Sequence, residues 1–133
     1  MVFLVAYIVA AIVFFGLDFV WLGTVAIGFY RRMIGPLMRE KPNFAAAGLF
    51  YLLYIGGIVY FAIAPALAGG DWSKAAVSGG VFGFLAYATY DITNLSTLKN
   101  WPIRMCVVDI AWGTVATGLA ATAGYAAVRS IFG

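Results

Sequence analysis

Three carboxylate side chains lie inside or at the ends of long apolar stretches of this sequence. Asp18, Asp91 and Asp109 are three of only five acidic residues in a chain that is 65% hydrophobic and 10% charged. A carboxylate at the centre of a bilayer costs about 2.5 kcal/mol or more, so such groups normally face a protein interior, where they serve proton, ion or ligand sites. These three residues are therefore the first candidates for chemistry.

Two of these acids begin the same short pattern. Asp18 precedes Trp21 by three residues. Asp109 precedes Trp112 by the same number, and this spacing places both members of a pair on one helix face. The likeness continues as LGTVA and GTVA, with an offset of one residue that turns a helix by about 100°. In antiparallel neighbours each tryptophan would lie level with the other helix's aspartate, as in inverted repeats of transporters. The alternative is two interfacial tryptophans beside two structural carboxylates.

The third carboxylate lies in the longest polar segment, TYDITNLSTLKNWP, at residues 89–102. The candidate ligand-binding residues of this segment are Tyr90, Asp91, Thr93, Asn94, Lys99 and Trp101. Part of the polarity is typical of helix ends, since Asn94 suits a left-handed cap. Two interpretations of the remainder stay open: Lys99 or Arg104 neutralises a carboxylate at the membrane edge, or the segment covers a polar pocket that opens to the cytoplasm.

The sequence lacks the residues that most cofactors require. Histidine is absent, and Cys106 is the single cysteine. Haem, iron–sulfur clusters and the usual zinc sites depend on these residue types, so we expect none of these cofactors. Any metal would have only oxygen ligands. No nucleophile–base pair is recognisable, so no catalytic residue is assigned, and Cys106 is expected to be a small packing residue.

Four apolar runs must position these groups, at residues 2–29, 44–67, 75–90 and 106–128. About 20 apolar residues cross the hydrocarbon core as a helix, and the third run reaches that length only when it is extended to Thr93. A membrane β-barrel would need alternating apolar residues, whereas these runs are apolar at both alternating positions. We therefore predict an all-α integral membrane bundle of four transmembrane helices with short loops, as a single domain over residues 1–133.

The basic residues predict the orientation. The connections after the first and third runs carry six of the eight lysines and arginines, namely Arg31, Arg32, Arg39, Lys41, Lys99 and Arg104. The positive-inside rule places these two connections in the cytoplasm and both termini outside. The net charge of +3 therefore reflects topology. The basic residues are too few and too dispersed for a nucleic-acid partner, and the expected partner is the lipid bilayer.

The segment YDITNLSTLKNWP, with DxxW in the first run and DxxWGT in the last, resembles the pattern of a family of small bacterial membrane proteins, the domain of unknown function 2177. The likeness extends over essentially the whole chain. It implies a four-helix protein of the bacterial inner membrane, and it implies no reaction. The matching positions are Asp18, Trp21, Tyr90, Asp91, Thr93, Asn94, Thr97, Lys99, Trp101, Pro102, Asp109 and Trp112.

Three classes of function remain open. The first is a protein that binds or translocates a proton or a small polar, cationic or lipid-derived ligand at a carboxylate pocket facing the cytoplasm. The second is an enzyme in which a buried aspartate acts as acid or base on a lipid or isoprenoid. The third is an accessory subunit, or a homo-oligomer, that meets membrane-protein partners through glycine-rich faces at residues 79–83 and 113–121.

Reporter fusions test the orientation. A fusion after residue 133 should report the outer side of the membrane, and a fusion within residues 39–43 should report the cytoplasm, because the basic loops stay inside. Alkaline phosphatase and green fluorescent protein, fused at the same positions, measure the two outcomes. A carboxyl-terminal fusion that is active in the cytoplasm would contradict the orientation and the depth assigned to the acids.

Overall fold

Four long helical segments make up the computed structural model, which describes all 133 residues and contains no strand. The first segment consists of α1 (Val2–Trp21), the π-helical turn η1 (Leu22–Ala26), α2 (Ile27–Ile34) and the short 3-10 turn η2 (Gly35–Leu37). The second consists of α3 (Phe44–Ile58), the π-helical turn η3 (Val59–Ile63) and α4 (Ala64–Gly69). The third and fourth are α5 (Trp72–Thr97) and α6 (Ile103–Phe132). The predicted all-α class with four helices is confirmed.

Three of these segments are both long and apolar enough to cross a membrane: Val2–Leu37, Phe44–Gly69 and Ile103–Phe132. The remaining helix, α5, has 26 residues and is therefore about 39 Å long, but its last turns carry the polar residues that follow Tyr90. The helices extend beyond the apolar runs of the sequence, so the connections are shorter than expected. These spans are those of a multi-pass membrane protein.

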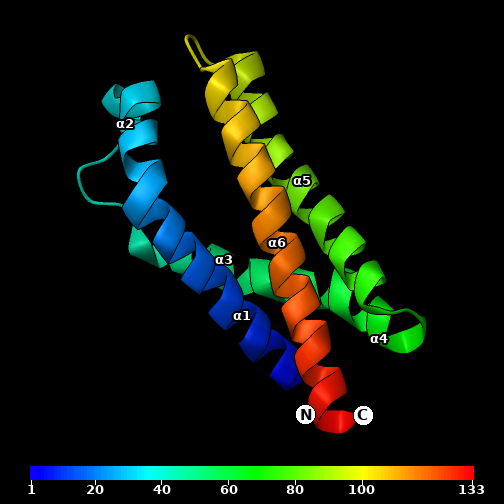
Figure 1. Cartoon of the computed structure of the whole chain (residues 1–133). Coiled ribbons are helices and arrows are strands. Elements are labelled where there is room, and N and C mark those ends of the chain that lie inside the picture. Colours follow the sequence, from blue (N-terminus) through cyan, green and yellow to red (C-terminus); the bar gives the residue numbers. More distant parts are fainter.

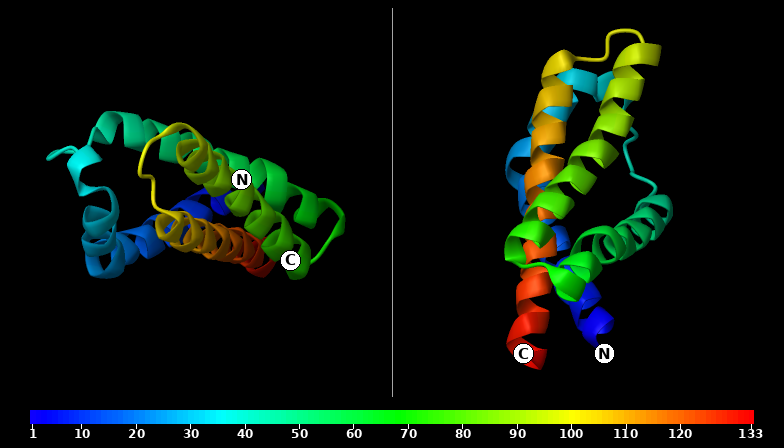
Figure 2. Two further views of the ribbon diagram at one scale, coloured as in Figure 1. Left: turned by 90° about the horizontal axis from the view of Figure 1, so that it is seen from above. Right: turned by 90° about the vertical axis from the view of Figure 1, so that its right-hand side faces the viewer.

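Helices α5 and α6 form an antiparallel hairpin, and α1 packs along α6 (Figure 1). The segment from α3 to α4 crosses the other helices obliquely and contacts them largely through η3 (Figure 2). Both chain termini lie at the same end of the bundle, opposite the turn between α5 and α6 (Figures 1 and 2). Because most contacts of this segment lie in η3, the early part of α3 diverges from the bundle (Figure 2).

Glycines bring α6 into backbone contact with its neighbours. A Cβ atom on Gly83 of α5 would clash with the carbonyl oxygen of Gly113. A Cβ atom on Gly124 would lie 3.1 Å from the carbonyl oxygen of Ala6 in α1. Because lipid provides no hydrophobic driving force between helices, close packing of this kind is a principal source of stability.

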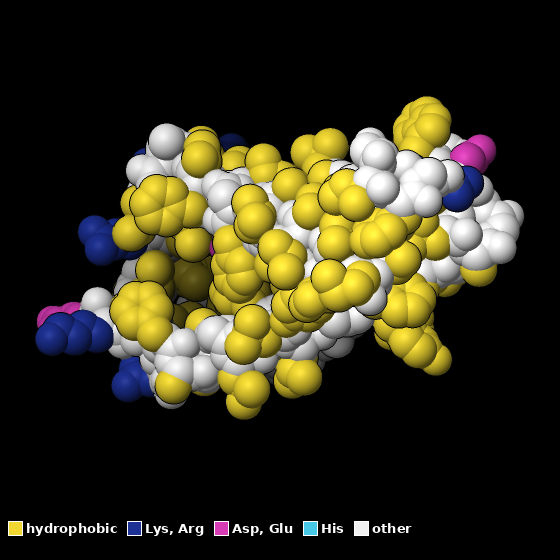
Figure 3. Space-filling model, turned by 90° about the horizontal axis from the view of Figure 1, so that it is seen from below, with side chains coloured by type: hydrophobic (Ala, Val, Ile, Leu, Met, Phe, Trp, Pro, Cys, Tyr) yellow, Lys and Arg dark blue, Asp and Glu magenta, His cyan; other side chains and the backbone are white.

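The buried core lies where α1, η3 and α6 meet. Phe14, Ile58 and Ile63 are fully buried there, together with small residues such as Ala6 and Ala116. The outer surface is largely apolar along the middle of the molecule, and charged side chains gather towards its two ends (Figure 3). This distribution matches the apolar middle and the polar boundaries of a bilayer.

Asp71 caps the first turn of α5. Its side chain accepts hydrogen bonds from the Ser73 hydroxyl and, at 3.1 Å, from the backbone N–H of Lys74. These bonds, led by the one from Ser73, hold the pKa of Asp71 below its usual range because they stabilise the charged carboxylate. This acid therefore has an ordinary structural role at a helix end.

The turn between α5 and α6 corrects one expectation. Asn94 is not a left-handed cap, because α5 continues through it to Thr97. The hydroxyl groups of Ser96 and Thr97 donate to carbonyl oxygens four residues earlier, and these local bonds occur within a continued helix. The left-handed residue is Asn100, with φ of 61°.

Replacement of Gly83 by alanine tests the contact between α5 and α6. The added methyl group would meet the backbone of Gly113, which cannot move aside as a flexible side chain would. We expect Gly83→Ala to lower the free energy of unfolding by about 1–3 kcal/mol, as overpacking does elsewhere. Unfolding of the purified chain in detergent micelles measures the change. Gly16→Ala is the matched control, since nothing lies within 4 Å of its added methyl group. An equal loss in both variants would argue against backbone contact as the cause.

Candidate functional site

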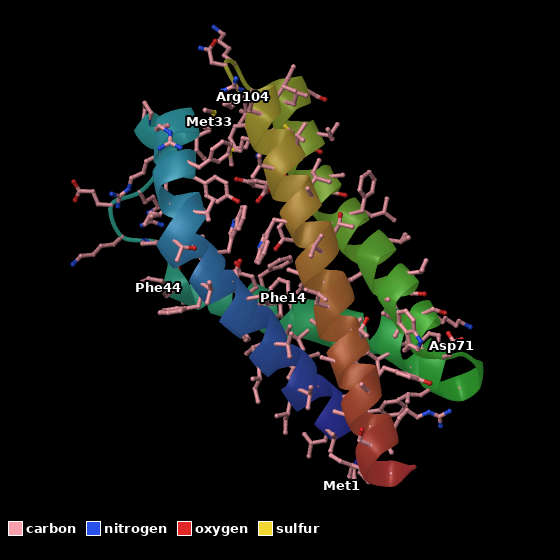
Figure 4. All side chains as sticks on the ribbon, in the orientation of Figure 1. Met1, Phe14, Met33, Phe44, Asp71 and Arg104 are labelled. Carbon is pink, nitrogen blue, oxygen red and sulfur yellow. The ribbon has the colours of Figure 1, made fainter.

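Stacked tryptophans join the first and last helices. The rings of Trp21 and Trp112 have centroids 4.5 Å apart and planes inclined by 6°. Side chains fill the space between the first helical segment and α6, between the labelled Phe14 and Met33 (Figure 4). The two helices are antiparallel, so Trp112 lies close to Asp18, and Trp21 is connected to Asp109 through the Tyr30 hydroxyl.

Both acids of the DxxW pattern accept hydrogen bonds from neutral donors. The indole N–H of Trp112 donates to Oδ1 of Asp18 at 3.4 Å, and the Tyr51 hydroxyl donates to Oδ2 at 3.2 Å. Across the stack, the Tyr30 hydroxyl donates to Oδ1 of Asp109 at 2.7 Å. The same hydroxyl accepts from the indole N–H of the α1 tryptophan at 3.4 Å. A continuous path of contacts thus connects two acids that are 91 residues apart in the sequence.

A single extra residue distinguishes the two copies of the pattern, and η1 accommodates it. Residues 18–28 read DFVWLGTVAIG and residues 109–118 read DIAWGTVATG, so the copies align when Leu22 is left out. Leu22 is the first residue of η1, and a π-helical turn holds one residue more between bonded groups than an α-helical turn does. The extra residue would turn the rest of the helix by about 100°, and the wider turn of η1 takes up this rotation. The residues after η1 therefore keep the orientation in which Tyr30 faces Asp109.

Asp91 approaches the same place from α5. Its side chain is fully buried, and neither carboxyl oxygen has a hydrogen-bond partner. The carboxyl group of Asp109 lies beside it, close enough to accept a hydrogen bond from a protonated Asp91. Neither Lys99 nor Arg104 donates a hydrogen bond to these two acids, so the ion pair considered for this segment is absent. Two adjacent carboxyl groups in a low-dielectric interior repel each other when both are ionised, so without a cation at least one holds a proton.

A cavity of about 300 Å³ opens beside Asp109, between α3 and α5. The lining residues are Ala47, Phe50, Tyr51, Tyr54, Ala86, Tyr87, Tyr90 and Asp109. Phe50 is 59% exposed and Tyr90 is 52% exposed, so these two rings form the rim and the cavity opens sideways between the helices. The surface is hollowed near the end of the molecule that carries most of the basic side chains (Figure 3).

Only some of the residues predicted for the site meet there. The residues of the acidic network are Asp18, Trp21, Asp91, Asp109 and Trp112. Thr93, Asn94 and Lys99 donate no hydrogen bond to these acids, and Thr93 and Lys99 are exposed. Trp101 is buried in a separate cluster, where its ring meets that of Tyr90 edge-on at 5.8 Å. The three acids do not form a group that could hold a metal ion together.

The sequence interpretation missed four tyrosines of this region: Tyr30, Tyr51, Tyr54 and Tyr87. A signal for three of them was present in YLLY at residues 51–54 and YATY at residues 87–90. Both segments repeat the spacing of three that places side chains on one helix face. Tyr30 has no comparable signal, because it depends on the phase of the helix after η1.

A family comparison matches most of the chain. The family described as "Predicted membrane protein (DUF2177)" matches residues 3–126, a range that includes the acidic network and the cavity. No curated protein and no solved structure matches the chain.

The stacked pair should give an exciton couplet in the ultraviolet circular dichroism of the purified chain, because indole rings 4.5 Å apart couple strongly. Trp112→Phe should abolish the couplet and remove the indole hydrogen bond to Asp18. Trp72→Phe is the matched control, since Trp72 lies 62% exposed at the start of α5 and should leave the couplet intact. Persistence of the couplet in Trp112→Phe would rule out the stack as its source.

Proposed function

The chain belongs to the DUF2177 family of predicted membrane proteins. From the geometry of its buried acids we propose that it binds a proton, or a small cation in exchange for it, at a site formed by Asp91 and Asp109, to which Asp18 is connected through the stacked tryptophans. The distribution of basic residues supports a site on the cytoplasmic side of the membrane. We place the protein in the bacterial inner membrane with both termini outside.

The observation that carries this proposal is the burial of Asp91 beside Asp109, with no hydrogen-bond donor from any other residue. An unsatisfied carboxyl group in an apolar interior destabilises a fold, and ionisable residues inside membranes usually mark proton or ion pathways. The adjacent Asp109 adds repulsion whenever both groups are ionised. A proton or a cation beside the two groups removes that repulsion, so the pair is suited to exchange one for the other.

Asp18 is part of the same unit because the stacked tryptophans connect it to Asp109. The Tyr30 hydroxyl that donates to Asp109 also accepts from Trp21, whose ring lies against Trp112. Hydrogen-bond networks of this kind respond as a whole when one member changes its charge. Their donors here are neutral, so nothing in the network offsets a negative charge on the acids, which favours cations over anions as ligands.

Two other functions use the same features. An enzyme that acts on a lipid or isoprenoid would use one aspartate as acid or base, and the sideways opening of the cavity supports access from the bilayer.

An accessory subunit or homo-oligomer would need a free glycine face. Gly83 and Gly113 pack inside the bundle, whereas nothing lies within 4 Å of a Cβ atom built on Gly16 or Gly23. A partner helix would therefore meet α1 and η1.

Infrared spectroscopy tests the protonated carboxyl group. At neutral pH in a low-salt buffer, the purified chain should show the carbonyl band of about one protonated carboxylic acid per chain, because Asp91 and Asp109 repel when both are ionised. Asp91→Asn should remove this band, since asparagine keeps the size of the side chain and cannot take up the proton. Asp71→Asn is the matched control and should retain the band, because Asp71 is an exposed, ionised helix cap.

The same variants separate function from folding. Asp91→Asn should reach the membrane in normal amounts. It should fail to restore whichever of membrane lipid composition and small-molecule tolerance differs between a deletion strain and the wild type, whereas Asp71→Asn should restore it. A wild-type chain without the carboxylic acid band at neutral pH would contradict the proposed proton site.

A further inference from the structure

We propose that the cavity beside Asp109 binds a quaternary or alkyl-substituted ammonium group. This inference rests on the proposed function and names the class of cation that the site would take. The positive group would lie among aromatic ring faces, with Asp109 as its counter-ion.

Aromatic rings make up most of the cavity wall. The rings of Tyr54 and Tyr87 form a corner, with centroids 6.4 Å apart and planes inclined by 69°. Phe82 stacks against Tyr54 at 5.1 Å, so Tyr87 supplies the ring face of this corner. Phe50 stacks beside Tyr54 at 5.9 Å, towards the rim. A cation within about 6 Å of a ring centroid is attracted by the negative face of the ring, and quaternary ammonium ligands are recognised in this way.

The two rings of this corner are held in place before any ligand arrives. A Cβ atom on Gly113 would clash with the Tyr87 ring, so this ring lies directly against the backbone of α6. The Tyr54 and Thr117 hydroxyl groups are hydrogen-bonded at 2.8 Å. Rings that are already ordered lose little conformational entropy on binding, which favours affinity.

Asp109 supplies the charge, and the rest of the lining decides which cation fits. Asp109 lines the cavity, its bond from Tyr30 uses only Oδ1, and the unpartnered Asp91 lies next to it. The seven other lining residues are alanines, phenylalanine and tyrosines. Apart from the tyrosine hydroxyls, of which those of Tyr51 and Tyr54 are already hydrogen-bonded, this wall offers no acceptor to replace the water around a metal ion or a primary amine. A quaternary ammonium group has no N–H donors to satisfy, and each alkyl group on other ammonium ions removes one donor, so these cations lose the fewest hydrogen bonds to water on entering.

The size of the cavity limits the ligand to a small group. A volume of about 300 Å³ is at the lower end of ligand cavities, and it suits a choline-sized cation better than a larger one. A free ammonium compound and a lipid head group share this chemistry. The opening between Phe50 and Tyr90 admits a group from the side of the bundle, so the source is decided by experiment.

Binding of choline and of its neutral isostere 3,3-dimethylbutan-1-ol tests the proposal. The two molecules have the same shape, and only choline carries a charge. Calorimetric titration of the purified full chain in dodecyl maltoside micelles should show choline binding at least about tenfold more tightly, because ring faces and a carboxylate both attract the charge. Equal affinities, or no binding of choline, would overturn the ammonium site.

Variants of the lining locate the binding. Tyr87→Leu keeps an apolar wall and removes one ring face, so choline should bind about 3–30-fold more weakly, whereas Tyr87→Phe should lose much less. Asp109→Asn should weaken the binding of choline and leave that of the isostere unchanged. Tyr60→Leu is the matched control, because Tyr60 is 72% exposed and lies outside the lining. An equal loss in Tyr60→Leu and Tyr87→Leu would refute the location.

Two further measurements separate the source of the ligand and the two ways of failing. If the natural ligand is a lipid head group, phosphatidylcholine added to the micelles should displace choline. If choline stays bound in the presence of phosphatidylcholine, the natural ligand is a free ammonium compound. Both results support an ammonium group as the ligand. If the carboxylic acid band is present and choline does not bind, the ligand class is wrong and the proton site stands. If the band is absent, the proton site itself is wrong.

Discussion

The cost of placing carboxyl groups in a bilayer governs the arrangement of this protein. Three of its five acids lie in long helices of the bundle, and each must be kept from lipid. Helices α1, α5 and α6 are rotated so that these acids lie in one interior region. Tyrosine and tryptophan satisfy Asp18 and Asp109, and Asp91 is left without a donor. Of the three acids, Asp91 is therefore the one whose only polar neighbour is another carboxyl group.

The least apolar of the long helices is held by the closest backbone contact. Helix α5 carries the polar residues around Asp91, and its Gly83 lies against the backbone of α6. Close packing of small residues holds this helix to α6, while Val81, Phe84 and Leu85 on its outer side are exposed. Helix α3 has no comparable backbone contact, and its early part diverges from the bundle. The cavity lies between α3 and α5.

The repeated pattern gives the interior an approximate symmetry that its surroundings break. The two tryptophans stack face to face, and each acid receives a hydrogen bond from a tyrosine of another part of the chain. The insertion of Leu22 is absorbed by η1, a type of turn that occurs often at functional sites. Only Asp109 has a second acid beside it and a cavity in front of it. The two copies therefore have different surroundings, although their sequences are alike.

The helical class, the number of helices and the shared face of each aspartate and tryptophan could be predicted from the sequence. These features follow from local properties, namely the length of an apolar run and the pitch of a helix. The interpretation of Asn94 as a cap was wrong, because α5 continues through it to Thr97 and the left-handed residue is Asn100.

The partners of the acids were decided only by the tertiary structure. Tyr30 reaches Asp109 across 79 residues, and Tyr51 reaches Asp18 from an oblique helix. The rotation of each helix about its axis depends on which small residues meet distant backbones, as Gly83 meets Gly113. That packing energy belongs to pairs of segments, so no single stretch of the sequence contains it.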